Sequence, residues 1–136
     1  MVQNVDPRDV WQALADNPRA QLVDVRTDAE WTYVGLPDLG PLGKRTALIS
    51  WQVFPEMQVN GAFAEHLRAA GFTPDDHLYF LCRSGVRSLH AAAAAIDAGF
   101  PHAYNIADGF EGPPDTDGHR GQVAGWKCAG LPWRQR

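Results

Sequence analysis

The chain has 136 residues, of which 45% are hydrophobic and 21% charged, and its formal net charge is −4 at pH 7. This length and composition predict a single domain over residues 1–136 with its own core. The negative charge argues against nucleic acid or an anionic membrane as the main partner. The sequence has no apolar run of the roughly 18 residues that a transmembrane helix needs. Residues 1–6 lack the features of a signal peptide, so we expect a cytoplasmic location.

Helix and strand signals alternate along the first part of the chain. Asp6-Pro7 is typical of a capped helix start, and Asn17-Pro18 predicts the end of that helix. Residues 21–26 form a short apolar run that predicts a buried strand. A capped helical turn is predicted over 27–31. Residues 35–43 hold three glycines and two prolines, which predicts a loop.

The second part of the chain continues this alternation. The predicted elements are strands over 46–50, 77–81 and 103–106, a helix between Asn60 and Gly71, and an alanine-rich helix over 88–98. Residues 108–125 contain repeated glycines and predict a loop, after which Trp126 and Trp133 are expected to hold the C-terminus on the domain. Strands that alternate with helices predict an α/β fold with a mainly parallel central sheet flanked by helices.

The most informative segment is the turn that opens at Cys82, because it joins an apolar strand to a helix start. Free backbone N–H groups and the positive end of the helix dipole favour a thiolate there, and the thiolate is the nucleophilic form of cysteine. Arg83 and Arg87 can pair with an oxyanion. In parallel sheets, ligands bind at the carboxyl ends of the strands. The turn therefore predicts a cysteine that attacks an anionic substrate; the alternative is a buried structural cysteine followed by solvated arginines.

Three segments carry a resemblance to a known family. Residues 22–26 with Glu30-Trp31 are similar to the first signature of rhodanese-like domains, and residues 82–88 resemble the active-site loop of the sulfurtransferase form. Asp108-Gly109-Phe110 and residues 125–132 resemble the last loop and the C-terminal segment of the family. The family's usual Gly-His-Ile-Pro-Gly-Ala element is missing, and residues 34–38 stand in its place. The resemblance implies a single rhodanese-like domain.

The resemblance also implies a thiosulfate sulfurtransferase. The Cys82 thiolate attacks the outer sulfur of thiosulfate or a similar donor, and the resulting persulfide passes its sulfur to a thiol, to cyanide or to an acceptor protein. The loop that binds the sulfur and the donor is expected to comprise Arg83, Ser84, Gly85, Val86, Arg87 and Ser88, whose backbone N–H groups form an anion nest. The Ser84 and Ser88 hydroxyls can bond the sulfur or cap the helix, and for Ser88 the cap is favoured.

The resemblance implies that Asp24 and Arg26, at the end of the neighbouring strand, support the fold near the loop through an ion pair or hydrogen bonds rather than acting directly in catalysis. We expect no metal and no organic cofactor, because the two cysteines have neither the spacing nor the histidine partners of a zinc site. Cys128 is a minor candidate for resolving the persulfide as a disulfide.

Two other functions compete with sulfur transfer. A cysteine phosphatase would need an arginine six positions after the cysteine, where this chain has Ser88, and usually a histidine before it, where this chain has Leu81. The second alternative is a non-catalytic or sulfur-relay module that binds a partner protein, with residues 108–125 as a docking surface or flap. An inactive module would most simply have lost the cysteine, which this chain keeps.

Overall fold

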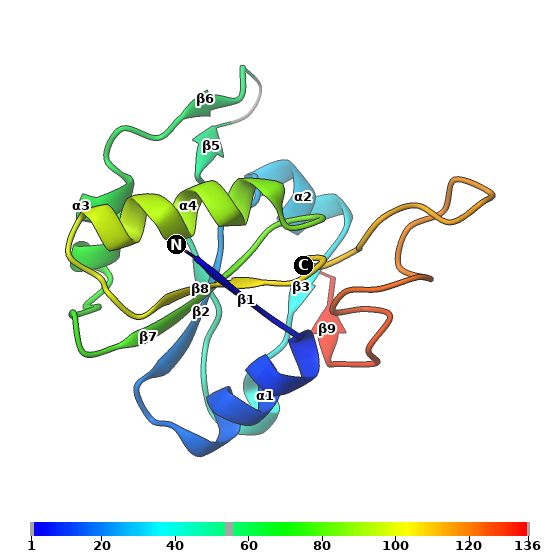
Figure 1. The fold of residues 1–136 in the computed structure, drawn as a ribbon. Helices are drawn as coiled ribbons and strands as arrows, with labels where there is room; N and C mark the ends of the chain where they lie inside the picture. The colour runs from blue at the N-terminus through cyan, green and yellow to red at the C-terminus, as the bar shows by residue number, and fades with distance from the viewer. Residues whose placement is uncertain (1, 54–55, 136) are drawn as a thin grey trace.

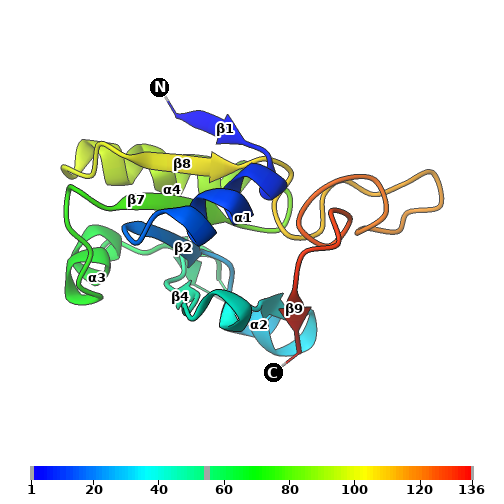
Figure 2. The ribbon, with the colours of Figure 1, turned by 90° about the horizontal axis from the view of Figure 1, so that it is seen from below.

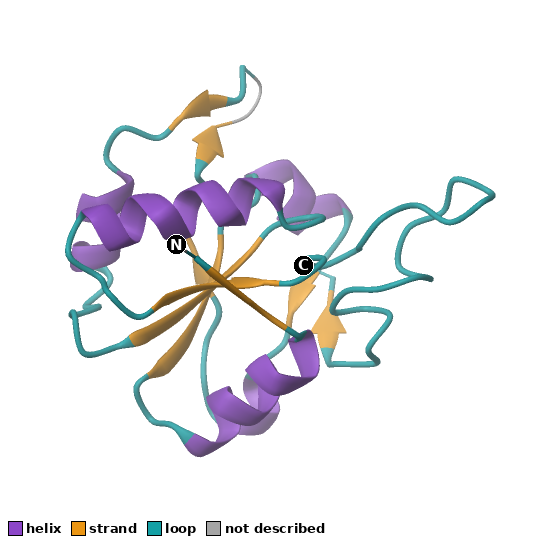
Figure 3. Ribbon diagram, in the orientation of Figure 1, coloured by secondary structure: helices purple, strands orange, loops and turns teal. Residues whose placement is uncertain are grey.

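The computed structural model describes residues 2–53 and 56–135, and its centre is a parallel sheet with helices on both faces (Figures 1 and 3). The sheet has five strands: β1 (Gln3–Val5), β2 (Ala20–Asp24), β4 (Ala47–Leu48), β7 (His77–Leu81) and β8 (Ala103–Ile106). The helices are α1 (Pro7–Asp16), α2 (Asp28–Tyr33), α3 (Phe63–Ala69) and α4 (Val86–Asp97), with a 3-10 turn, η1, over Gly40–Leu42. Two small antiparallel pairs complete the fold: β3 (Leu36–Pro37) with β9 (Trp133–Arg134), and β5 (Gln52–Val53) with β6 (Gln58–Val59).

The strand order β1-β8-β7-β2-β4 places β7 at the centre of the sheet, as Figure 2 shows. Strand β2 pairs with β7 in a register that sets Asp24 opposite Leu81. Strand β8 pairs with β7 on its other side. Because all these strands are parallel, their carboxyl ends meet at one edge of the sheet. Cys82 follows the last residue of β7 and therefore lies at that edge.

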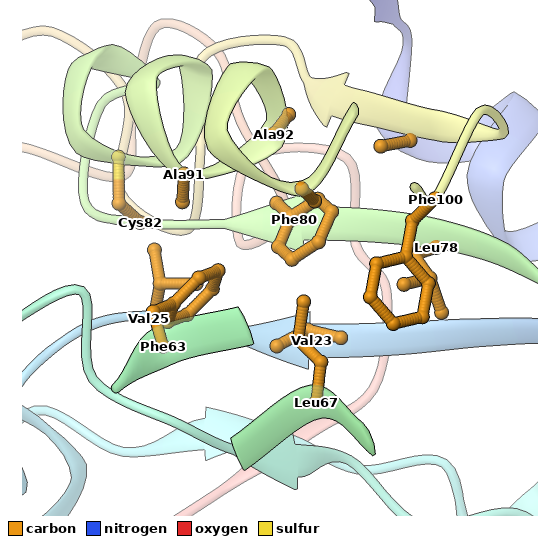
Figure 4. Close-up of a cluster of buried hydrophobic side chains, with 12 residues drawn as sticks. Val23, Val25, Phe63, Leu67, Leu78, Phe80, Cys82, Ala91, Ala92 and Phe100 are labelled. Carbon is orange, nitrogen blue, oxygen red and sulfur yellow. The ribbon is translucent and has the colours of Figure 1, made fainter. Parts of the chain in front are cut away.

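The core has two layers, one on each face of the sheet, because successive side chains of a strand point to opposite faces. Leu78, Phe80 and Cys82 belong to the layer under α3 and α4, which Figure 4 shows. Tyr79 and Leu81 belong to the layer under α1. The alanines of α4 let its backbone approach the sheet closely, and three of them are fully buried: Ala91, Ala92 and Ala95.

The predicted α/β class and parallel sheet are confirmed. The predicted start of α1 is also confirmed: Asp6 is the N-cap, and its carboxylate accepts a hydrogen bond from the Arg8 amide. The capped turn at Thr27 is confirmed as well, because both halves of a capping box are present. No helix among the described residues is long and apolar enough to cross a membrane.

Several predicted boundaries were wrong. The loop predicted over 35–43 contains β3 and η1, because Leu36 and Pro37 pair with the C-terminal strand β9. The strand predicted over 46–50 pairs only through Ala47–Leu48. The helix predicted over 88–98 begins two residues earlier, at Val86. Strand β1 and the β5–β6 hairpin, which projects beyond α4 in Figure 1, were not predicted, because their pairing partners are distant in the sequence or their runs are very short.

Candidate functional site

Cys82 lies under the turn between β7 and α4, and only 1% of its surface is exposed. Its Sγ accepts hydrogen bonds from the Gly85 amide at 3.0 Å and from the Ser88 hydroxyl at 3.2 Å. Gly85 precedes the helix with φ of 106°, a left-handed conformation that glycine adopts without steric cost. The turn therefore directs one backbone N–H and one hydroxyl at the sulfur.

A chain of hydrogen-bonded polar side chains continues from the buried Ser88 and Asn105 to the exposed Asn4 at the edge of the sheet. The Ser88 hydroxyl lies 2.5 Å from Asn105 Oδ1, and Asn105 Nδ2 donates to Asn4 Oδ1 at 2.8 Å and to the Gly85 carbonyl at 3.1 Å. Because a hydroxyl has one proton, Ser88 donates either to Cys82 Sγ or to Asn105 at any moment. Asn105 thus holds both the Ser88 hydroxyl and the backbone of the turn next to the sulfur.

The prediction that Ser88 caps helix α4 is wrong. The helix begins at Val86 behind Gly85, so Ser88 lies inside the first turn, fully buried, and its hydroxyl faces the sulfur and Asn105. The predicted helix start was too late, because a glycine with positive φ can occupy the cap position without a side-chain hydrogen bond.

The segment after β8 closes over the backbone of the cysteine turn. The Phe110 amide donates to the Cys82 carbonyl at 2.7 Å, and the Glu111 and Gly112 amides donate to the Arg83 carbonyl at 2.9 and 3.1 Å. Gly109, with φ of 61°, makes this approach possible, because a Cβ there would clash with the carbonyl oxygen of Cys82 and the backbone of Arg83. The two segments that resemble the rhodanese active-site loop and last loop are thus joined by backbone hydrogen bonds.

Arg87 does not extend into open solvent but pairs with Glu30 of α2. Its two terminal nitrogens bond the two carboxylate oxygens of Glu30 at 2.6 and 2.9 Å. The hydrogen bond to Glu30 raises the pKa of Arg87, and the charges of Glu30, Cys82 and Asp24 add to that rise, against the effect of burial. Burial alone would raise the pKa of Glu30, but the hydrogen bond and charge of Arg87, the Thr27 amide and the charge of Arg26 together lower that pKa. Arg87 is therefore a paired cation beside the thiol.

A cleft of about 370 Å³ borders the cysteine turn, and its lining residues are Glu30, Val34, Met57, Arg83, Arg87 and Glu111. Arg83 is exposed here, and no carboxylate of the described residues forms an ion pair with it. Met57, with φ of 57°, reaches the cleft from the β5–β6 hairpin. The cleft thus combines two acidic, two basic and two apolar side chains.

Asp24 and Arg26 form a fully buried ion pair beside the turn. Arg26 donates to both Asp24 carboxylate oxygens, with a shortest distance of 2.7 Å, and to the Gly35 carbonyl, also at 2.7 Å. Its guanidinium carbon lies 4.3 Å from the centre of the buried Phe110 ring. The pair thereby ties the end of β2 to the start of β3 and to the segment that covers Cys82.

Other residues considered in the sequence lie away from the thiol or serve the fold. Cys128 is an exposed free thiol in the last loop, where it contacts the Gln122 carbonyl, and Cys82 is free as well. Trp126 is fully buried and bonds the Pro132 carbonyl, whereas Trp133 is 41% exposed and packs edge-on against Phe110. Within the described ranges, no three histidine, cysteine or acidic side chains are grouped so as to hold a metal ion.

Three residues near the thiol were not foreseen in their present roles. Glu30 was expected to pack and cap a helix, and it does cap α2, but it also binds Arg87. Asn105 and Asn4 were not considered at all. Asparagine inside a strand pattern was the available signal for Asn105, because an amide buried on a central strand needs hydrogen-bond partners.

Known proteins resemble the chain over nearly its whole length. The family described as "STR4 middle domain" matches residues 3–136. The uncharacterized protein RP600 of Rickettsia prowazekii is 38% identical, and the match covers 98% of each chain. The sulfurtransferase of Allochromatium vinosum is 27% identical over 97% of this chain and 94% of its own. Rhodanese-like domain-containing protein 4 of Arabidopsis thaliana is 30% identical over 93% of this chain and 24% of its own.

Among solved structures, the crystal structure of Rv0390 from M. tuberculosis superposes with a TM-score of 0.89 and 46% sequence identity. The match covers 99% of this chain and 98% of that chain. The fold described above is therefore shared, from end to end, with a protein of similar size.

Proposed function

The chain belongs to the STR4 middle domain family and is a rhodanese-like domain, and from this premise we propose that it transfers sulfane sulfur through a persulfide on Cys82. The observation that carries the proposal is the position of Cys82 Sγ, which accepts hydrogen bonds from the Gly85 amide and the Ser88 hydroxyl at the carboxyl end of the central strand. These donors stabilise the negative charge of the Cys82 thiolate, which is the nucleophile of the first step and the leaving group of the second.

The proposed reaction has two displacement steps. In the first, the Cys82 thiolate attacks the outer sulfur of a donor such as thiosulfate; a bond forms between the two sulfurs, and the donor's S–S bond breaks with its electron pair leaving on sulfite. In the second, an acceptor such as cyanide or a thiolate attacks the terminal sulfur of the persulfide, and the Cys82 thiolate returns as the leaving group. With cyanide the product is thiocyanate, and each step conserves charge.

The surrounding residues have separate parts in this proposal. The loop proposed to bind the sulfur and the donor comprises Arg83, Ser84, Gly85, Val86, Arg87 and Ser88, and its Gly85 amide and Ser88 hydroxyl bond Sγ. Arg83 is the exposed cation at the cleft and would attract an anionic donor. Asp24 and Arg26, which are wholly buried, act by holding the neighbouring backbone in place.

The proposal is tested by the intact mass of the protein after incubation with thiosulfate, and again after addition of cyanide. We expect a gain of one sulfur atom, roughly 32 Da, that cyanide removes as thiocyanate, as covalent catalysis requires. The variant Cys82→Ser should show no gain. Cys128→Ser, which removes the exposed second thiol, is the matched control and should behave as the unaltered protein. Sulfur transfer by Cys82→Ser would refute the proposal.

A further inference from the structure

The cleft beside Cys82 is electrically balanced, although the sequence suggested a positive site. Two arginines and two glutamates line it, namely Arg83, Arg87, Glu30 and Glu111, so their formal charges cancel. Val34 and Met57 complete the lining. A doubly charged donor that enters this cleft loses hydration but meets no net positive charge in return.

Arg87 is neutralised by a bidentate ion pair with Glu30 that is difficult to break. Both terminal nitrogens of the guanidinium face both carboxylate oxygens, which is the bidentate arrangement that arginine forms most strongly. Glu30 is itself held from the other side, because its Oε1 accepts from the Thr27 amide at 3.3 Å and from the Thr27 hydroxyl at 3.1 Å. Turning Glu30 away from Arg87 would therefore also break the cap of helix α2.

From this arrangement we infer that Glu30 determines donor specificity: by occupying Arg87, it disfavours a dianion such as thiosulfate and favours a singly charged sulfane donor with an apolar group. This inference rests on the proposed function. Thiosulfonates and organic persulfides share the required chemistry, because each has one anionic sulfane end on an organic substituent. Val34 and Met57 offer that substituent an apolar surface.

The transfer step balances for each kind of donor. A thiosulfonate gives up its outer sulfur to the Cys82 thiolate and leaves as a sulfinate, which takes the electron pair of the broken S–S bond. A persulfide leaves as a thiolate, and thiosulfate leaves as sulfite. The bond formed is the same in all three reactions, so differences in donor use report on the cleft and on the leaving group.

The test compares kcat/KM for thiosulfate and for methanethiosulfonate, with cyanide as acceptor, in the unaltered protein and in Glu30→Gln. Glutamine also serves at that helix position, so the capping box is preserved. The substitution removes the carboxylate that neutralises Arg87, and the cleft then carries a net positive charge. We expect kcat/KM to rise about tenfold for the dianion and about threefold for the monoanion, because the attraction scales with donor charge. The leaving-group difference cancels when each donor is compared between the two proteins. The thiosulfate gain should shrink at high salt.

Glu111→Gln is the matched control, because it removes one negative charge from the same cleft and leaves the Arg87–Glu30 pair intact. Its gain with thiosulfate should be clearly smaller than that of Glu30→Gln. Equal gains in the two variants, or no gain in Glu30→Gln while it still uses methanethiosulfonate, would overturn the inference. Cysteine persulfide is a third donor that distinguishes persulfides from thiosulfonates. If Glu30→Gln raises its kcat/KM about as much as that of methanethiosulfonate, donor charge and not the type of organic donor determines the effect of Glu30. Failure of every donor to load Cys82 would instead refute the proposed function.

Discussion

Replacing Arg26 by methionine should destabilise the fold strongly, because it leaves a buried carboxylate without its cation. Arg26 and Asp24 have no exposed side-chain surface, and three hydrogen bonds of 2.7 to 3.2 Å join the guanidinium to the carboxylate. Methionine keeps much of the volume over Phe110, so the lost charge dominates the effect rather than a cavity.

The expected cost follows from the burial of the pair. Breaking a buried pair by removing one partner costs about 3–5 kcal/mol. The Gly35 carbonyl also loses its donor, which adds about 1 kcal/mol. Domains of this size have unfolding free energies of about 5–15 kcal/mol, so the variant folds only where the unaltered protein lies above the lower end of that range. With a urea m-value of about 1.5 kcal/mol per M, a total loss of about 4–6 kcal/mol should lower the unfolding midpoint by about 3 to 4 M.

The assay is urea unfolding followed by tryptophan fluorescence, with Arg19→Met as the matched control. Arg19 is 60% exposed and lies 3.7 Å from Asp76, and an exposed pair of this kind contributes about 0–1 kcal/mol. The control midpoint should therefore move by less than about 0.7 M. Similar shifts of the unfolding midpoint in the two variants would show that burial of the Asp24–Arg26 pair does not increase its contribution to the free energy of unfolding.

Three further outcomes follow from the site. Gly109→Ala should lower both the urea unfolding midpoint and the extent of persulfide formation, because a Cβ at this positive φ meets the Cys82 carbonyl. If neither quantity changes, the close packing of Gly109 on the cysteine turn is contradicted. Ser88→Ala should slow persulfide formation about tenfold or more, since hydrogen bonds to charged groups contribute about 1.5–3 kcal/mol. The rate is measured by mass spectrometry after rapid quenching, and an unchanged rate would show that the hydroxyl has no part in the proposed mechanism. Because the folded-state pKa of Glu30 is lowered, its pairing stabilises the fold above about pH 4.5, and this stability is lost as the pH falls through the lowered value. The acid-side decline in urea midpoint should be shallower in Glu30→Gln, and identical pH profiles would argue against this linkage.

The alternation of the main strands and helices was readable from the sequence, because it depends on local patterns, whereas β1, β3 and the β5–β6 hairpin were not predicted. The apolar run that ends at Cys82 and the turn with Gly85 marked the proposed nucleophile and its place at the end of a strand. Asp6 and Thr27 marked two helix starts, because caps act on backbone groups only a few residues away. The resemblance to rhodanese-like domains drew on the same short segments.

Element boundaries were harder to predict where pairing decided them. Strand β3 exists because the chain end returns to pair with Leu36 and Pro37, and a run of glycines and prolines gives no sign of that return. The early start of α4 left Ser88 inside the helix and turned its hydroxyl toward the sulfur.

The sequence by itself determined the fold class, the proposed nucleophile and the positive charges beside its thiol. Only the tertiary structure decided which of those charges is free, because Glu30 and Arg87 are 57 positions apart and meet through the packing of α2 beside the cysteine turn. The same holds for Asn4 and Asn105, which are 101 positions apart and join the polar chain behind Ser88 through the pairing of β1 with β8. Local patterns report backbone preferences over a few residues, whereas the charge balance of a site depends on contacts that exist only once the sheet has assembled.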